Sequence, residues 1–301
     1  MHTGEISERQ ASDRKARVFD MGLLSGLDGL GLGGLEDMDI YEEEEKRKET
    51  AKAKAAAQTE ERDIIYEKSY NCPVCDLDFS SKTVKSGKAK LLGTDADLRA
   101  RYDIVDPVKY DVVVCPRCGY AALTRFFPYI TDAQAKLIKE KISQKVNIPA
   151  HIDLTYSYDE AMERYKLALV NAVVKRGKAS EKAYICLKSG WLARGYRESL
   201  QESGEATSQQ LADLESQEEE YMMNAYKGFI EARQSEGFPM CGMDEVTVDY
   251  LLAVLAARFK KYDVASRMVA SVLGSPAANP RMKDKARDLK EQILADMKKN
   301  K

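Results

Sequence analysis

The sequence predicts an α+β fold, in which a small four-cysteine β domain precedes a mainly α-helical region. Two Cys-x-x-Cys pairs lie among short β-branched and aromatic runs, which are typical of strands. From Thr131 onward, apolar residues recur with the period of a helix almost to the end of the chain. The beginning of the chain is polar and rich in glycine, and we expect it to be disordered. The predicted parts are a flexible tail with a charged linker over 1–63, the cysteine domain over 64–130 and the helical domain over 131–301.

The predicted tail carries 10 Lys and Arg against 16 Asp and Glu. Its residues 22–35 alternate glycine and leucine and contain a G-x-G-x-x-G pattern, but no strand precedes it, which argues against a dinucleotide site. The segment is either a plain flexible tail or a short motif that docks on a helical groove. The leucines of that motif would be Leu23, Leu24, Leu27 and Leu30. Met21 is a candidate for the true start of the protein, because the texture of the sequence changes there.

The two cysteine pairs are the strongest functional signal. Cys72 and Cys75 lie in CPVC, and Cys115 and Cys118 lie in CPRCG. Four thiolates in two such turns match a tetrahedral metal site, with sulfur ligands at about 2.3 Å from the ion. Closed four-cysteine sites are typically structural zinc sites, so the pattern predicts one structural Zn²⁺ in a zinc-ribbon-like domain. Gly119 permits the backbone turn that directs amides toward the sulfurs.

Two other uses of the cysteines remain open. The CPRCG knuckle also resembles that of rubredoxin, in which four cysteines hold one redox-active iron. A thiol–disulfide pair is a further alternative, but it normally opens a helix in a thioredoxin-like βαβ unit, and no such unit is predicted. The 39 residues between the pairs exceed the spacing of a compact ribbon. We expect the excess to form a β-hairpin insertion over 79–110.

The predicted insertion contains a polar cluster, GTDADLRARYD. Such opposed charges either form surface ion pairs or contact a ligand or partner. The candidate contact residues are Asp95, Asp97, Arg99, Arg101 and Tyr102. Upstream, four lysines are spaced as if on one strand face, where they would touch phosphates or keep an edge strand soluble. They are Lys82, Lys85, Lys88 and Lys90.

The helical region divides at glycines and prolines into seven predicted helices. Their ranges are 132–145, 157–175, 180–198, 208–234, 245–259, 262–273 and 281–298. The patterns that begin at Tyr158 and Tyr262 resemble the second helix of a tetratricopeptide unit, with Ala161 and Ala265 as the small packing residues. We therefore expect a tetratricopeptide-like array, with a plain helical bundle as the alternative. Trp191 and Cys186 are predicted core residues.

No catalytic apparatus is predicted. The chain has two histidines, His2 and His151, which is too few for a usual catalytic zinc site, and we expect His151 to be a solvated loop residue. No apolar run reaches the roughly 20 residues of a membrane helix, and no signal peptide is predicted. We expect a cytoplasmic protein, since unexported cysteine pairs more often bind metal than form disulfides. Residues 64–130 carry only 10 basic against 8 acidic residues, a weak footprint for nucleic acid.

The stretch from YEKSYNCPVC through DADLRARYD to VVVCPRCGYAAL resembles an uncharacterised bacterial family found mainly in Firmicutes and their relatives. That family couples a four-cysteine ribbon to a tetratricopeptide-like tail, and the resemblance covers about residues 64–300. It implies that the four knuckle cysteines are metal ligands, and it implies no activity. The leading hypothesis is a non-enzymatic adaptor that binds a protein or peptide through its helices. The alternatives are a nucleic-acid-associated ribbon and rubredoxin-like electron transfer.

Overall fold

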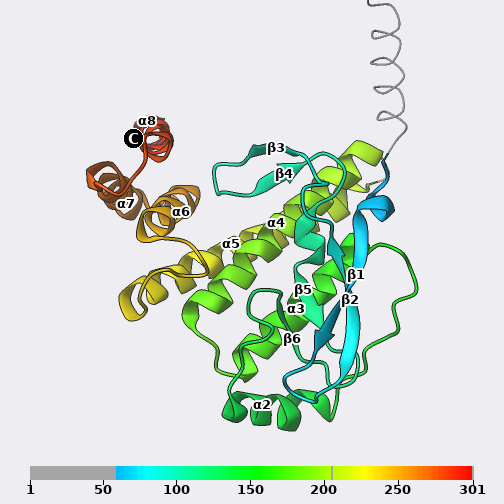
Figure 1. Ribbon diagram of the computed structural model, residues 1–301. Coiled ribbons are helices and arrows are strands. Elements are labelled where there is room, and N and C mark those ends of the chain that lie inside the picture. Colours follow the sequence, from blue (N-terminus) through cyan, green and yellow to red (C-terminus); the bar gives the residue numbers. More distant parts are fainter. Residues whose placement is uncertain (1–58, 205, 300–301) are drawn as a thin grey trace, which may run out of the picture. The chain divides into compact units, whose positions relative to one another are not determined.

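The computed structural model describes residues 59–204 and 206–299. The chain divides into two units, residues 1–59 and 60–301, and the second contains the structure described below. The predicted flexible tail, the leucine motif of 22–35 and the candidate start at Met21 lie outside the described residues. The described chain begins with three antiparallel strand pairs and continues as a mainly helical region (Figure 1).

Both cysteine knuckles are the turns of β-hairpins. Strand β1 (Ile65–Asn71) turns through the first knuckle into β2 (Asp78–Val84), and Ile65 lies opposite Val84. Strand β5 (Val112–Val114) turns through the second knuckle into β6 (Ala121–Leu123). The prediction of a hairpin insertion over 79–110 is therefore partly wrong, because β2 pairs with β1 across the knuckle. The remaining hairpin is shorter, with β3 (Leu91–Thr94) paired to β4 (Ala100–Tyr102).

The helices begin and end close to the predicted residues because their start signals are local. Thr131, Ser157 and Thr207 each accept a hydrogen bond from the backbone N–H three residues on, as N-cap residues do. The helices are α2 (Asp132–Ile138, extended by a π-helical turn Lys139–Ser143), α3 (Tyr158–Val174), α4 (Ala179–Ser203), α5 (Ser208–Ser235), α6 (Glu245–Arg258), α7 (Tyr262–Gly274) and α8 (Pro280–Lys299). No described helix is both long and apolar enough to cross a bilayer.

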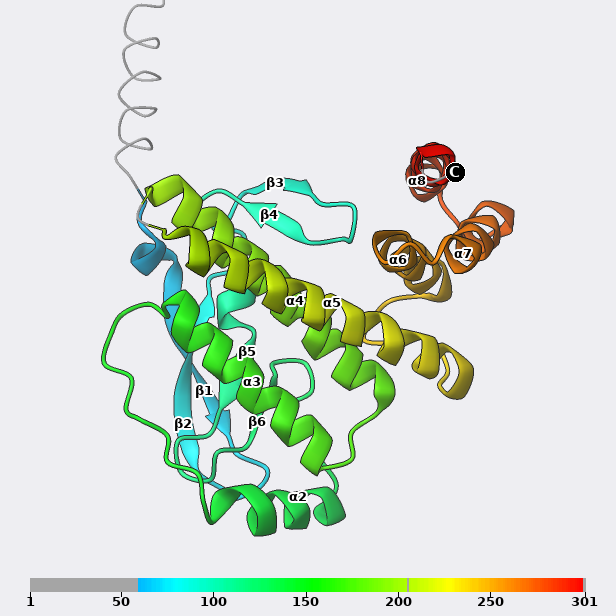
Figure 2. The ribbon, with the colours of Figure 1, turned by 180° about the vertical axis from the view of Figure 1, so that it is seen from behind.

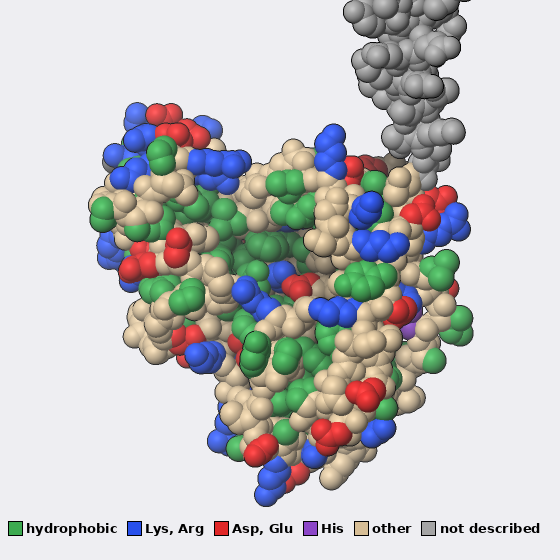
Figure 3. All heavy atoms as spheres, in the orientation of Figure 1, with side chains coloured by type: hydrophobic (Ala, Val, Ile, Leu, Met, Phe, Trp, Pro, Cys, Tyr) green, Lys and Arg blue, Asp and Glu red, His purple; other side chains and the backbone are tan. Residues whose placement is uncertain are grey.

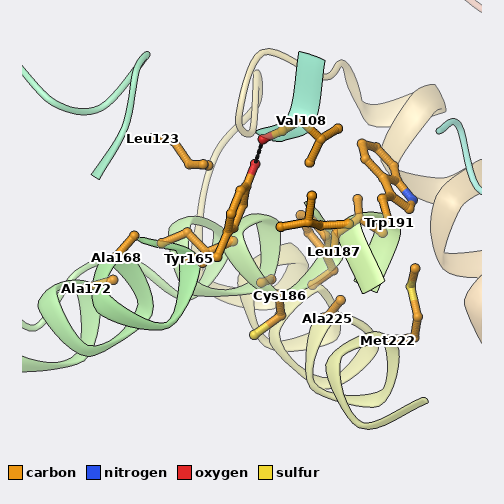
Figure 4. Packing of buried hydrophobic residues seen from close by; sticks show 14 of the residues in the cluster. Val108, Leu123, Tyr165, Ala168, Ala172, Cys186, Leu187, Trp191, Met222 and Ala225 are labelled. Atoms are coloured by element: carbon orange, nitrogen blue, oxygen red, sulfur yellow. Dashed lines mark hydrogen bonds between the residues drawn. The ribbon is translucent and has the colours of Figure 1, made fainter. Parts of the chain in front are cut away.

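A hydrophobic core joins the second knuckle hairpin to the helices. Val112 and Leu123 from β5 and β6 pack in one cluster with side chains of α3, α4, α5 and α6. Tyr165 of α3 is fully buried there, and its hydroxyl donates to the carbonyl of Val108 at 3.0 Å (Figure 4). Trp191 is only 8% exposed in the same core, which confirms its predicted core role. The strands that carry the cysteines are thus held against the helices by apolar burial.

A separate apolar cluster lies among α6, α7 and α8. Its fully buried members include the small residues Ala253, Ala265 and Ala286, one from each helix, which let the helices approach closely. Helices α3, α4 and α5 follow one another as neighbours, with α4 packed against both others (Figure 2). The face drawn in Figure 3 is hollowed beside the β3–β4 hairpin, where hydrophobic side chains gather.

Candidate metal centre

The two knuckles repeat one backbone design. In the first, the N–H of Asp76 donates to the carbonyl of Cys72 at 2.8 Å, and in the second Gly119 donates to Cys115 at 3.0 Å. Asp76 and Gly119 both have positive φ, at 57° and 67°. That left-handed turn closes the loop around each cysteine pair, as Gly119 was expected to do. Asp76 was missed in the sequence, although its place directly after the second cysteine was the available signal.

The sulfur atoms lie close enough to share one ion. The Sγ atoms of all four knuckle cysteines are within 4.8 Å of one another, and no other group of three or more metal-ligating side chains occurs in the described part of the chain. The Sγ atoms of Cys72 and Cys118 are 3.6 Å apart, as are those of Cys75 and Cys115. Four sulfurs at about 2.3 Å from a tetrahedral ion would be about 3.8 Å apart, so the cluster fits such an ion.

Hydrogen bonds among the sulfurs shift the pKa values of the cluster in opposite directions. Hydrogen bonds with Cys118 and Cys72 lower the pKa of Cys115 to about 2. The hydrogen bond with Cys115 correspondingly raises the pKa of Cys72 to about 12 and raises that of Cys118. Backbone amides of Val74 and Cys75 face the Cys72 sulfur, and they favour its thiolate. The sulfurs therefore share protons, and a divalent ion would displace those protons when it binds.

The second knuckle is bound to the helices by two side chains. Asn171 of α3 is fully buried, and its Nδ2 donates to the carbonyl of Gly119 at 3.1 Å. Ser143, at the end of the π-helical turn, donates to the carbonyl of Cys118 at 2.9 Å. The Gly119 backbone also meets Val146 so closely that a Cβ there would lie 2.5 Å from a Val146 methyl. These contacts fix the position of the knuckle relative to α3, and thereby the position of two of the four sulfurs.

The predicted contact cluster in the β3–β4 hairpin is only partly on the surface. Asp97 and Arg99 are 5% and 6% exposed, so the expectation of surface ion pairs is wrong for them. Arg194 of α4 binds Asp97 with two nitrogens, at 2.6 and 3.2 Å, and Arg99 Nη1 lies 2.9 Å from Glu198 Oε2. These partners lie about a hundred residues away in the chain, so the short sequence pattern gave no sign of them.

The other cluster members lie at the margin of this network. Asp95 accepts from Arg194 Nη1 at 3.1 Å, and the half-exposed Arg101 lies 3.8 Å from Asp95. Arg101 and Tyr102 line a polar cavity of about 310 Å³ between the hairpin and α4. Asp106 lies beside the same cavity, and its burial raises the pKa of its carboxyl group. Their role as ligand or partner contacts stays a prediction.

The remaining sequence expectations have mixed outcomes. The four lysines do not lie along one strand, because β2 ends at Val84. Lys82 pairs with Glu67 at 2.6 Å, and Lys85 donates to a backbone carbonyl. His151 is half-buried and bonded to Glu160, so it is not a solvated loop residue. Cys186 is buried, as expected, and burial raises the pKa of its thiol to about 11.

Comparison with known proteins identifies a family whose model covers most of the chain. Residues 65–293 match a family model described as an uncharacterized protein conserved in bacteria (DUF2225). The matched range contains both knuckles, the β3–β4 hairpin and the helices as far as α8. No curated protein and no solved structure matches the chain.

Proposed function

The chain belongs to this bacterial family, and we propose that it is a non-enzymatic, metal-stapled adaptor that binds a protein or peptide through its helices. The observation that carries the proposal is the cysteine cluster. Three of its four cysteines are buried, and the second knuckle is bound to α3 through Asn171. A closed cluster of this kind supports a structural role, because a catalytic zinc keeps an open position. Zn²⁺ is the proposed ion, since closed four-cysteine sites are typically zinc sites.

The proposed unit is a zinc ribbon followed by a tetratricopeptide-like array in a cytoplasmic protein. Ala161, Tyr165 and Ala265 are fully buried, which supports the packing that the repeat pattern requires. Repeats of this kind present concave surfaces to their partners. Lys82 and Lys85 already have partners within the fold, which argues against the nucleic-acid alternative.

The first test is the metal content of reduced, purified protein, by elemental mass spectrometry with an absorbance spectrum. We expect about one zinc per chain, lost in Cys72→Ser and retained in Cys186→Ser, which removes a buried cysteine outside the cluster. One iron with thiolate absorbance bands would make the protein rubredoxin-like instead. Protein free of metal would contradict the proposed structural metal site. A pull-down that recovers nucleic acid and no protein would contradict the proposed adaptor function.

A further inference from the structure

A groove of about 590 Å³ runs along the α3, α4 and α5 face of the protein. Its residues on α5 extend from Gln217 to Glu231 and recur at intervals of three, four and seven, so they form one stripe of that helix. At 1.5 Å per residue, this stripe is about 21 Å long. The groove is therefore as long as about four turns of a helix.

Small residues make the floor of the groove. Ala179, Ala183 and Cys186 of α4 line it, and Gly228 of α5 lies beside them. A Cβ on Gly228 would lie 2.8 Å from the Cβ of Ala183, so the two helices approach closely there. Larger side chains of α3 and α5 form the two walls of the groove, on either side of α4.

The walls combine apolar surface with separated charge. Val173 of α3 lines the groove and is 57% exposed, although it is apolar. Lys166 and Lys182 lie on the side of α3 and α4, whereas Glu220 and Glu231 lie on α5. No ion pair involves these four side chains within the described residues. The groove thus has a basic edge and an acidic edge, both available to a partner.

We propose that this groove binds an amphipathic α-helix of a partner protein. The helix carries acidic residues on the edge that faces Lys166 and Lys182, and basic residues on the edge that faces Glu220 and Glu231. The groove is long enough for about four turns of a helix. Amphipathic helices are recognised by grooves of this kind, in which they bury their apolar face. Opposed charges on the two edges fix the direction in which the helix lies. This inference rests on the proposed adaptor function, whose binding surface it specifies.

Two synthetic 16-residue helical peptides test the proposal on the metal-loaded full chain. Both have the same alanine and leucine stripe; one, the matched peptide, has glutamates along one flank and lysines along the other, and the second has lysines along both flanks, which no direction of binding can match to both edges. We expect the matched peptide to bind at least tenfold more tightly by fluorescence anisotropy. Val173→Glu should abolish that binding, whereas Val170→Glu, on the same helix but outside the groove lining, should not. Equal affinity for the two peptides, or equal loss in both variants, would overturn the proposal.

A charge-reversed variant gives a second readout. Replacing Lys166 and Lys182 by glutamate makes both edges acidic, so the variant should prefer the peptide with two lysine flanks, a reversal that mere loss of folding cannot produce. A pull-down with the two valine variants distinguishes a wrong groove assignment from a wrong adaptor function. If wild type and both variants capture the same protein partner equally, the groove assignment is wrong and the adaptor stands. If wild type captures no protein and binds neither peptide, both are wrong.

Discussion

Asp76 and Gly119 follow the second cysteine of their knuckles and share one backbone conformation. Both have positive φ, which costs an ordinary residue about 1–2 kcal/mol and glycine almost nothing. Aspartate tolerates this region better than most residues, which explains why the first knuckle functions without a glycine. The two positions nonetheless differ in their surroundings, because Gly119 is buried against the side chain of Val146, whereas Asp76 is exposed.

Gly119→Ala should lower the free energy of unfolding of the metal-loaded protein by about 1–2 kcal/mol or more. The alanine would have a strained backbone conformation, and its methyl group would lie 2.5 Å from a methyl group of Val146. Asp76→Gly should leave the stability unchanged or raise it by up to about 1 kcal/mol, since it removes strain. Urea unfolding followed by circular dichroism measures both. Equal effects in the two variants would contradict this account of the knuckles.

At the scale of elements, one buried carboxylate joins three helices. Glu218 of α5 is 1% exposed, and its oxygens lie 2.8, 3.0 and 2.8 Å from nitrogens of Arg194, Arg197 and Arg258. Arg194 also holds Asp97 of the β3–β4 hairpin. The network therefore connects α4, α5 and α6 through Glu218, and it includes the hairpin through Arg194.

Glu218→Gln should destabilise the protein strongly, by about 3–5 kcal/mol, because it leaves three cations around an uncharged group. The matched control is Glu215→Gln, one turn earlier in α5. Glu215 is 66% exposed and has one ion pair, at 3.3 Å, so its loss should cost about 0–1 kcal/mol. Urea unfolding of the two variants under identical metal loading gives the comparison. A loss at Glu218 no larger than that at Glu215 would show that the network contributes little.

Features that depend on local contacts could be predicted from the sequence, whereas features that depend on distant contacts could not. Helix starts at Thr131, Ser157 and Thr207 depend on residues three positions away, and they lie where predicted. The four cysteines were assigned together because two short patterns signal one site. The pairing of β2 with β1 was missed, since the long spacer suggested a self-contained insertion. The partners of Asp97 and Arg99 lie in α4, and no pattern within a short window identifies a contact across about a hundred residues.

At the scale of the described molecule, the apolar clusters differ in their relation to the cysteines. One cluster surrounds the knuckle cysteines and includes Val113, Tyr120 and Phe127. Val174 of α3 packs against this cluster. The cluster of α6, α7 and α8 contains no knuckle residue. The free energy of metal binding should therefore stabilise the first cluster directly, whereas the C-terminal helices have apolar burial of their own.

Removal of the metal should consequently loosen one part of the protein before the other. Hydrogen exchange with mass spectrometry, before and after chelation, is the measurement. Amides of β5, β6 and the last turns of α3 should lose protection, because Asn171 no longer holds a fixed Gly119 carbonyl. Amides of α7 and α8 should keep most of theirs, and metal added back should restore the rest. Equal loss of protection in α8 would mean that the protein folds as one metal-dependent unit, whereas unchanged β5 and β6 would mean that no metal stabilises the knuckles.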